Sequence, residues 1–275
     1  MTTGAEGAGS NVVISAKDVC KNFALKGRSV TALQNLSLDI RQGEFMSLLG
    51  PSGCGKSTFL YIVGGLVPFN SGELLMDGKP ISGPSRDRGF VFQESTLFPW
   101  LSVAENIAFG LRLNAAGGQS DASITATVDS LLNLVGLSGF GKFRPDELSG
   151  GMKQRVAIAA CLASDPKVLL MDEPFGALDS QTRGVMQTEL LRLHEESGRT
   201  TLFVTHDIRE AILLSDRIAV MSMRPGTVKE IVEVELPRPR WKHLREDNAD
   251  FLQLERYLHQ LLDHDIRLVS GSAAA

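Results

Sequence analysis

A glycine-rich segment has the residue types and the spacing needed to hold a chain of phosphates: Gly50-Pro51-Ser52-Gly53-Cys54-Gly55-Lys56-Ser57. It has the pattern G-x-x-x-x-G-K-[ST], directly after the apolar run Phe45–Leu49 and before a helical pattern. Glycines let successive backbone N–H groups turn toward phosphate oxygens, the start of the next helix adds partial positive charge, and Lys56 neutralises the β and γ oxygens. Ser57 is expected to offer its hydroxyl to Mg²⁺, and Thr58 to reach the α-phosphate.

A second segment places two carboxylates at the end of an apolar run, Val168-Leu169-Leu170-Met171-Asp172-Glu173. A carboxylate that leaves a strand beside the phosphate loop can hold the Mg²⁺ shell, which assigns Asp172. The adjacent Glu173 is expected to polarise a water for in-line attack on the γ-phosphate. Together the two segments predict nucleotide hydrolysis. Cys54 is interpreted as a tolerated loop residue rather than a redox centre, although a nearby helix start is of the kind that lowers a thiol pKa.

A third segment, Leu148-Ser149-Gly150-Gly151-Met152-Lys153-Gln154-Arg155, precedes Asp172 by a short helix and resembles the signature motif of ATP-binding cassette (ABC) proteins. The resemblance covers about residues 11–235 and includes, in family order, Phe23, Gln93 in Val91-Phe92-Gln93, Asp179 in Ala177-Leu178-Asp179 and His206 in Val204-Thr205-His206-Asp207. It implies ATP and Mg²⁺ as cofactors and counts Asp179 among the nucleotide-binding residues. It also implies that Gln93 contacts Mg²⁺ and water, that His206 contacts the γ-phosphate, and that Phe23 stacks on adenine, where the family more often has Tyr.

The signature segment also predicts a second anion site. Ser149, Gly150 and Gly151 open a helix whose first N–H groups lack intrahelical partners. In the family fold this site is remote from the phosphate loop, so one chain holds two half-sites that cannot meet within it. A head-to-tail pair of cassettes completes both.

The elements that position these residues follow from hydrophobic periodicity. Leu36, Leu38 and Ile40 alternate with polar residues, and 12–20 is similar, so the chain is expected to open with antiparallel β structure. The apolar runs 45–49, 168–171 and 202–204 predict strands buried in a parallel sheet, each followed by a helical pattern. Between them, about residues 100–150 predict a helical insertion. The fold class is α/β, and the resemblance implies a P-loop NTPase of ABC type with a mixed sheet core, an antiparallel β subdomain and a helical subdomain.

The ends of the chain are expected to lie outside this cassette. Residues 1–10 and 270–275 are interpreted as flexible tails and 236–269 as a C-terminal helical extension with an amphipathic helix over 251–262. The segment 237–241 is basic and is interpreted as a solvated connection, with a binding function as the alternative. Asp207, three residues before Glu210, resembles a capping box that would fix the turn carrying His206. The remaining histidines, predicted to be surface residues, are His194, His243, His259 and His264.

Two classes of ABC protein differ in what they act on: a transporter ATPase subunit, or a soluble ATPase acting on nucleic acid or ribosomes. The chain of 275 residues has one set of motifs, no long coiled-coil heptads, three scattered cysteines and a net charge of −4, which favours the transporter and argues against nucleic acid. It has no apolar run of about 18 residues and no secretory signal pattern, so a peripheral location on the cytoplasmic face of the inner membrane is expected.

A short apolar segment, Leu97-Phe98-Pro99-Trp100-Leu101, follows Gln93. Simple packing of the helical insertion explains it, but in this family the same region receives a cytoplasmic helix of the membrane permease, and exposed Phe and Trp suit such a groove. Two regions resemble the nitrate/sulfonate/taurine group of bacterial importers. One is 87–93 together with this apolar segment, and the other is the run 224–226 leading to 234–240. The resemblance implies a permease and, indirectly, a periplasmic solute-binding protein as partners, and leaves the transported substrate open.

Overall fold

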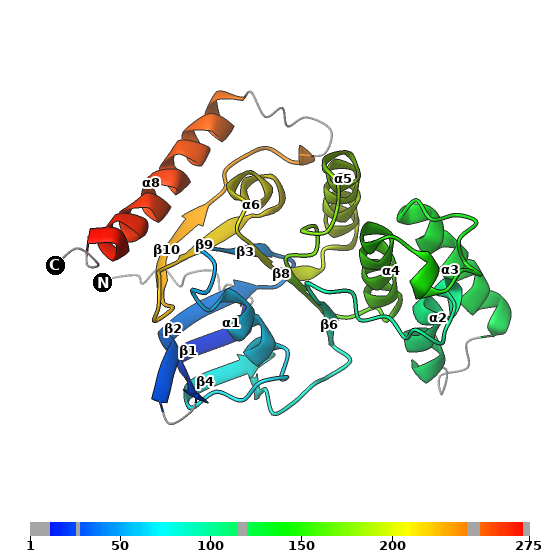
Figure 1. Ribbon diagram of the computed structural model, residues 1–275, viewed down its shortest axis with the longest axis horizontal. Coiled ribbons are helices and arrows are strands. Elements are labelled where there is room, and N and C mark those ends of the chain that lie inside the picture. Colours follow the sequence, from blue (N-terminus) through cyan, green and yellow to red (C-terminus); the bar gives the residue numbers. More distant parts are fainter. Residues whose placement is uncertain (1–11, 26–27, 115–119, 241–247, 272–275) are drawn as a thin grey trace, which may run out of the picture.

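The computed structural model describes residues 12–25, 28–114, 120–240 and 248–271, which form two sheets surrounded by helices (Figure 1). The strands are β1 (Val12–Leu25), β2 (Arg28–Arg41), β3 (Phe45–Leu49), β4 (Ser71–Met76), β5 (Lys79–Pro80), β6 (Arg88–Val91), β7 (Val168–Asp172), β8 (Thr200–Thr205), β9 (Arg217–Met221) and β10 (Val228–Glu233). The helices are α1 (Lys56–Val63), α2 (Val103–Asn114), α3 (Asp121–Leu134), the 3₁₀ turn η2 (Pro145–Glu147), α4 (Gly150–Ala163), α5 (Ser180–Ser197), α6 (Ile208–Leu214) and α8 (Ala249–Gly271). The predicted tail 1–10 lies outside the described residues, as do 272–275 of the predicted tail 270–275, whose first two residues belong to α8.

The antiparallel sheet predicted for the start of the chain is confirmed, with strand order β2-β1-β4-β5. In β2, Leu36, Leu38 and Ile40 are buried while the polar residues between them are exposed. This alternation arises because successive side chains of a strand point to opposite faces, and only one face of β2 packs on the core.

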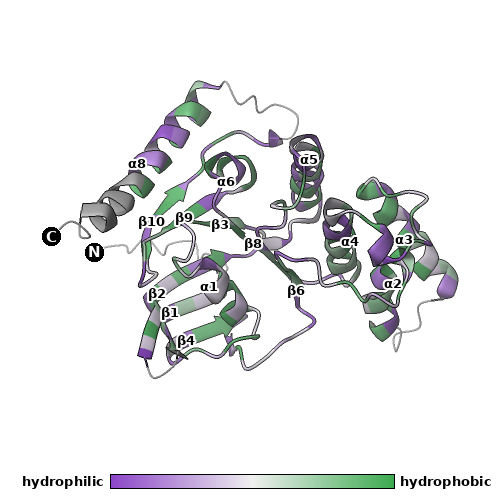
Figure 2. Cartoon of the chain, viewed as in Figure 1, coloured by the Kyte–Doolittle hydropathy of each residue, from purple (hydrophilic) through white to green (hydrophobic). Residues whose placement is uncertain are grey.

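A mixed sheet of order β10-β9-β3-β8-β7-β6 forms the centre of the molecule. Strands β9, β3, β8, β7 and β6 are parallel, and only β10 pairs antiparallel at the edge. All residues of β3, β7 and β8 are buried, as their apolar runs predicted, and Figure 2 shows the hydrophobic colouring of these central strands. Because the strands are parallel, their carboxyl ends meet at one edge, where the phosphate loop, the two acids and His206 follow.

The predicted helical insertion is confirmed as a separate lobe, in which α2, α3 and α4 pack together to one side of the central sheet (Figure 1). Its core includes Ile107 and Leu111 of α2 with Val128 and Leu132 of α3, all buried. The helical spacing of these residues places them on one face of each helix, so the faces can pack together. The lobe therefore forms where the sequence pattern changes from that of strands to that of amphipathic helices.

The interpretation of 237–241 as a solvated connection is wrong for its described residues. Arg238 pairs with Asp216 (2.6 Å) and Glu195 (3.0 Å), and Arg240 is only 2% exposed. The Arg240 guanidinium donates to main-chain carbonyls of Ile212, Leu213, Ser215, Val234 and Leu236. The last carbonyls of a helix lack intrahelical partners, and Arg240 provides donors at the end of α6. Burial lowers its pKa to about 10.

Helix α8 packs on α6 through the buried residues Phe251 and Leu258, and lies along the outer side of the molecule (Figure 1). The interpretation of His194 as a surface residue is wrong, because it lies on the buried face of α5, 6% exposed, with its ring edge to face with Phe45. His259 is exposed as predicted, whereas His243 and the side chain of His264 lie outside the described part of the chain.

Candidate functional site

The phosphate loop connects β3 to α1 and places the first turn of α1 at the end of the sheet. Gly53 and Gly55 have φ of 80° and 107°, a region that favours glycine. A Cβ on Gly55 would also lie 2.7 Å from a methyl carbon of Leu33, so a side chain there would force the loop away from β2. The Lys56 ammonium lies within the loop and donates to the carbonyls of Gly50 (2.7 Å) and Pro51 (3.0 Å).

Cys54 is buried behind this loop, with its Sγ 3.9 Å from the Lys56 nitrogen. Burial raises the pKa of the Cys54 thiol despite the neighbouring charge, so the helix start does not lower it. The thiol therefore stays protonated, which agrees with the interpretation of Cys54 as a tolerated loop residue without redox chemistry.

Ser57 and Asp172 meet beneath the phosphate loop. The Ser57 hydroxyl donates to Asp172 Oδ1 at 2.8 Å, while Asp172 Oδ2 is buried without a hydrogen-bond partner among the described residues. Burial raises the pKa of Asp172, opposed by hydrogen bonds from Ser57 and Tyr61. A hydroxyl beside a carboxylate with a free oxygen is the donor set that suits Mg²⁺, so the residues present fit the predicted ion.

Glu173 and His206 form the next pair along the same edge. Glu173 has φ of 45°, and its N–H donates to the Val204 carbonyl at 3.0 Å. Its Oε2 lies 3.0 Å from His206 Nδ1, and the Glu173 side chain is 18% exposed. His206 follows β8 directly, so the parallel pairing of β7 with β8 brings the two residues together. A carboxylate held by a histidine at the edge of a cavity is placed to accept a proton from water.

The turn after His206 is fixed differently from the expected capping box. Asp207 Oδ1 accepts from the Glu210 N–H at 3.1 Å, which is half of that arrangement. Glu210 does not return the bond to Asp207, because its carboxylate turns inward to Thr205 and Gln187, and burial raises its pKa. The Asp207 N–H donates to Thr205 Oγ1 instead, at 3.0 Å.

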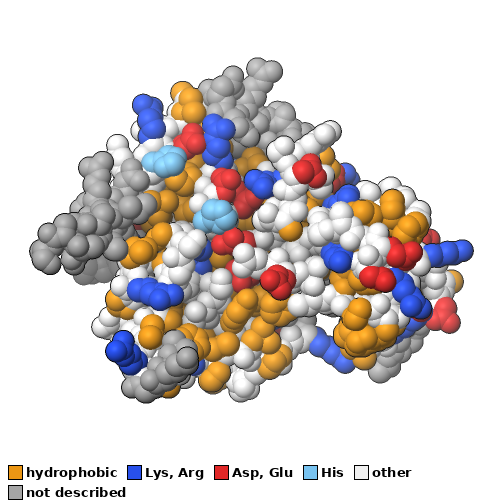
Figure 3. All heavy atoms as spheres, viewed as in Figure 1, with side chains coloured by type: hydrophobic (Ala, Val, Ile, Leu, Met, Phe, Trp, Pro, Cys, Tyr) orange, Lys and Arg blue, Asp and Glu red, His pale blue; other side chains and the backbone are white. Residues whose placement is uncertain are grey.

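A hollow of about 520 Å³ lies against this site, and Gly50, Pro51, Cys54 and Asp172 are not among the described residues that line it. The predicted residues that line it are Phe23, Ser52, Gly53, Gly55, Lys56, Ser57, Thr58, Gln93, Glu173 and His206. Phe23, on β1, is 37% exposed, and its ring lies 4.8 Å from the Lys21 ammonium. Near the middle of the face in Figure 3, acidic side chains gather around a histidine, between the positions of α1 and α6. Val30, Ala32 and Arg224 also line the hollow, and sequence reasoning did not include them in the site.

The signature residues lie elsewhere. Ser149 caps α4 by accepting from the Met152 N–H at 3.3 Å, and a Cβ on Gly150 would meet nothing within 4 Å. Asp179 caps α5 by accepting from the Thr182 N–H at 3.0 Å, and this bond lowers the pKa of Asp179. Ser149, Gly150, Gly151 and Asp179 are absent from the described residues that line the hollow, in agreement with the prediction that a single chain does not unite the two half-sites.

One bond connects α4 to the strand end that carries Gln93. The Gln154 side chain, 1% exposed, donates through Nε2 to the Phe92 carbonyl at 2.8 Å. Gln154 belongs to the segment that resembles the signature motif. This segment therefore contacts the end of β6 through Gln154, while Ser149 lies at its N-terminal end.

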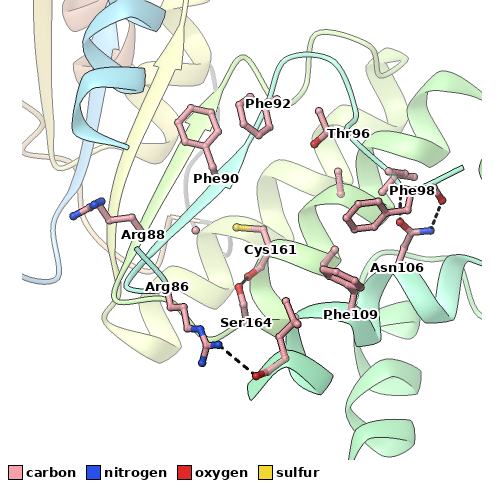
Figure 4. Close-up of a pocket in the computed structure, with 16 residues that line it drawn as sticks. Arg86, Arg88, Phe90, Phe92, Thr96, Phe98, Asn106, Phe109, Cys161 and Ser164 are labelled. Carbon is pink, nitrogen blue, oxygen red and sulfur yellow. Dashed lines mark hydrogen bonds between the residues drawn. The ribbon is translucent and has the colours of Figure 1, made fainter. Parts of the chain in front are cut away.

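A second hollow, of about 320 Å³, lies between β6, α2 and α4 (Figure 4). Arg86 and Arg88 line one end, and Phe98, Asn106 and Phe109 line the other. Asn106, 5% exposed, holds the predicted docking segment by accepting from the Phe98 N–H at 2.8 Å and donating to nearby carbonyls. Trp100 is 67% exposed and its ring centroid lies 5.4 Å from that of Phe98.

Comparison with known proteins agrees with this geometry. Residues 33–176 match the family model described as ABC transporter. The chain belongs to the ABC transporter family. The cassette is 49% identical over 225 residues to the taurine import ATP-binding protein TauB of Roseobacter denitrificans, covering 82% of each chain. It is 48% identical over 231 residues to the aliphatic sulfonates import ATP-binding protein SsuB of Bacillus cereus, covering 84% of this chain and 90% of SsuB.

A solved structure supports the same assignment. The cassette MJ0796, in a dimeric post-hydrolysis state bound to ADP and Pi, matches with a TM-score of 0.75 and 35% identity over 82% of this chain and 100% of MJ0796. The predicted fold class is therefore confirmed. In the described part of this ABC protein, no helix is long and apolar enough to cross a membrane.

Proposed function

We propose that this chain is the ATP-hydrolysing subunit of a bacterial ABC importer that takes up a small solute of the nitrate, sulfonate or taurine type. The relatives named above are import ATP-binding proteins for sulfonates and taurine. The observation that carries the proposal is that Lys56, Ser57 and the Glu173–His206 pair line one and the same hollow. The alternative of a soluble ATPase acting on nucleic acid has no support among these relatives.

The proposed mechanism divides its steps among the residues of this hollow and the buried Asp172 beside it. Lys56 binds the β and γ phosphate oxygens, exchanging its bonds to loop carbonyls for charged ones. Ser57, Asp172 and Gln93 would hold Mg²⁺, which offsets negative charge on the phosphates when bound. Glu173 accepts a proton from the attacking water while His206 orients the carboxylate and contacts the γ-phosphate. Phe23 supplies an aromatic face for adenine.

A second copy of the chain completes the site in this proposal. The N-terminal end of α4, with Ser149, Gly150 and Gly151, presents N–H groups that suit a phosphate bound by the partner's loop. Asp179, the N-cap of α5, follows Leu178, whose side chain would lie 3.2 Å from a Cβ on Gly151. The support for a pair of cassettes is that MJ0796, to which this chain is similar, is dimeric in its solved structure.

The proposed membrane partner is a permease that docks at the second hollow near Leu97–Leu101. The support is the exposed Trp100 ring, packed on Phe98 and backed by Asn106, which gives a fixed aromatic anchor. We place the chain on the cytoplasmic face of the inner membrane, as a peripheral subunit, with a periplasmic solute-binding protein acting through the permease. Residues 11–235 form the proposed cassette and 236–269 its extension.

The test is ATP binding and Mg²⁺-dependent phosphate release by the purified chain and its Lys56→Ala variant. The variant is expected to bind ATP at least about tenfold more weakly and to lose hydrolysis, because the phosphates lose their nearest fixed positive charge. Near-normal turnover in Lys56→Ala would overturn the assignment of the phosphate loop. Failure of the unmodified chain to bind ATP would overturn the proposed function itself.

A further inference from the structure

The loop from Ser222 to Thr227, between β9 and β10, is closed on itself and tied to β2. The Ser222 N–H donates to the Thr227 carbonyl at 3.0 Å, and the Thr227 N–H donates to Ser222 Oγ at 3.1 Å. The Gly226 N–H donates to the Ala32 carbonyl at 2.9 Å, and the Gln34 N–H donates to the Gly226 carbonyl at 3.1 Å. The loop is therefore held on both sides by backbone hydrogen bonds.

This loop lies directly against the phosphate loop. A Cβ on Gly226 would lie 2.0 Å from the Cys54 carbonyl oxygen, a contact that only glycine avoids. At Gly50, a Cβ would lie 3.0 Å from the Met221 carbonyl oxygen, so the end of β9 contacts the start of the phosphate loop as well. These contacts fix the position of residue 224 relative to the phosphate-binding residues.

Arg224 extends from this loop over Gly53. Its Nε donates to the Gly53 carbonyl at 2.7 Å, and a Cβ on Gly53 would lie 3.3 Å from Arg224 Nη2. The guanidinium has five N–H donors, and the bond to Gly53 uses the one on Nε. The N–H donors on Nη1 and Nη2 are left for a ligand, because Arg224 lines the same hollow as Lys56 and Glu173.

The charge of Arg224 is not neutralised by any other side chain in the part of the chain that the structure describes. Among the described residues none forms an ion pair with it, whereas Arg217 pairs with Glu44 and Arg238 pairs with Asp216. Of the described residues that line the hollow, Lys56 and Arg224 carry permanent positive charges. A guanidinium with free parallel donors beside a phosphate loop matches the geometry of phosphate oxygens.

We propose that Arg224 is a further nucleotide-binding residue that contacts the phosphates of the bound nucleotide through its Nη groups while its Nε holds Gly53. The proposal rests on the proposed function, because it uses the same nucleotide site. It assigns part of the nucleotide affinity to the β9–β10 loop. That loop lies outside the residues from which the sequence predicted binding, which are Phe23, 50–58, Gln93, 149–151, 172–173, Asp179 and His206. Arg224 binds substrate and transition state alike, so it acts on affinity more than on turnover.

The experiment compares Arg224→Gln and Arg224→Lys in the full chain, with Arg256→Gln as a control that removes the same charge from an exposed position on α8. The probes are MgATP and MgADP, measured by titration calorimetry, with steady-state hydrolysis of MgATP alongside. Arg224→Gln is expected to raise the Kd and the KM for ATP about tenfold with kcat within about twofold of the unmodified chain. Arg224→Lys keeps the charge and is expected to recover most of the affinity. Arg256→Gln is expected to bind as the unmodified chain does.

Salt dependence separates a phosphate contact from a purely structural role of Arg224 at Gly53. Salt screens an exposed charge pair, so affinity of the unmodified chain falls more steeply between about 0.05 and 0.5 M NaCl than affinity of Arg224→Gln. An unchanged Kd in Arg224→Gln overturns the proposal. So does a Kd raised alike in the Gln and Lys variants with the original salt dependence, which would mean that Arg224 only supports the turn. Either result leaves ATP hydrolysis by the unmodified chain, and thus the proposed function, intact.

Discussion

Replacing Glu173 with Gln removes a proton acceptor while leaving most of the surrounding structure in place. The Glu173 N–H bond to the Val204 carbonyl is a backbone bond and is unaffected. The backbone strain at φ 45° is also the same for Glu and Gln, so it cancels between the two proteins. A Gln carbonyl oxygen can still accept from His206 Nδ1, which lies 3.0 Å from the present Oε2. The change therefore tests proton transfer rather than folding.

The magnitude follows from what is lost. Glu173 is the carboxylate in the hollow that faces His206, and an amide cannot take a proton from water at neutral pH. Removal of a general base costs about 10² to 10⁴ in rate, or about 3 to 5.5 kcal/mol of transition-state stabilisation. The residues assigned to ATP binding, Lys56, Ser57 and Thr58, are unchanged. ATP affinity is expected to stay within about threefold of the unmodified chain, well under the 1.4 kcal/mol of a tenfold change.

The assay combines phosphate release with size-exclusion chromatography in MgATP. Glu173→Gln is expected to hydrolyse slowly and to accumulate as a nucleotide-bridged dimer. Adding Ser149→Arg is expected to dissolve that dimer by placing bulk and charge at the partner's phosphate. Because Ser149 also caps α4 through the Met152 N–H, the matched control is Ser149→Ala, which loses the same cap, worth about 1 kcal/mol, without added bulk.

Two results would refute this reasoning. Hydrolysis by Glu173→Gln at the unmodified rate would mean that another residue activates the water, and His206→Ala would then be the variant to measure. A dimer that disappears with Ser149→Ala as fully as with Ser149→Arg would mean that loss of the cap, rather than the bulk and charge placed at the partner's phosphate, separates the two chains.

Two further predictions concern regions away from this pair. Phe98→Ala with Trp100→Ala is expected to reduce copurification with the permease at least about tenfold, with ATP affinity within about twofold of the unmodified chain. The control is Val185→Ala on α5, where the side chain is 58% exposed against 67% for Trp100. An unfolded variant beside intact transport would mean that the rings only pack the lobe. Arg240→Ala is expected to lower the free energy of unfolding in urea by about 2 to 4 kcal/mol, because carbonyls at the end of α6 lose a buried donor. As the control, Arg256→Ala on the exposed face of α8 is expected to change that free energy by less than about 0.5 kcal/mol. A loss below about 1 kcal/mol for Arg240→Ala would show that water replaces the guanidinium.

The parts of the molecule predicted correctly from sequence have local signals. The buried strands β3, β7 and β8 contain apolar runs, and apolar residues alternate with polar ones in β2. The phosphate loop is marked by its fixed spacing of Gly, Lys and Ser. Because parallel strands end at one edge, the loop, Asp172 and His206 could be expected to meet there. The pairing of Glu173 with His206 follows from the adjacency of β7 and β8, which no local pattern specifies.

The residues interpreted wrongly have partners that are distant in sequence or lie in the backbone. Arg240 binds carbonyls from α6 and from the strand end after β10, and carbonyls leave no mark in a sequence. His194 faces Phe45, far away in the chain. Glu210 has the spacing of a capping residue but lies over Thr205 and Gln187, which draw it inward. Arg224 lines the site because its loop is held to β2 and to the phosphate loop by contacts that only the folded chain reveals.

The bond between Gln154 and the Phe92 carbonyl has a consequence for how the helical lobe moves. Gln93 is the next residue after Phe92, so a shift of the Gln93 main chain toward a ligand would displace the carbonyl that Gln154 binds. Gln154 is buried, and breaking its bond would cost about 1 to 3 kcal/mol. The lower-energy course is for α4 to travel with the strand end, carrying Ser149 at its first turn. In the proposed dimer, a main-chain shift at Gln93 would therefore also change the orientation in which α4 presents Ser149 to the partner chain.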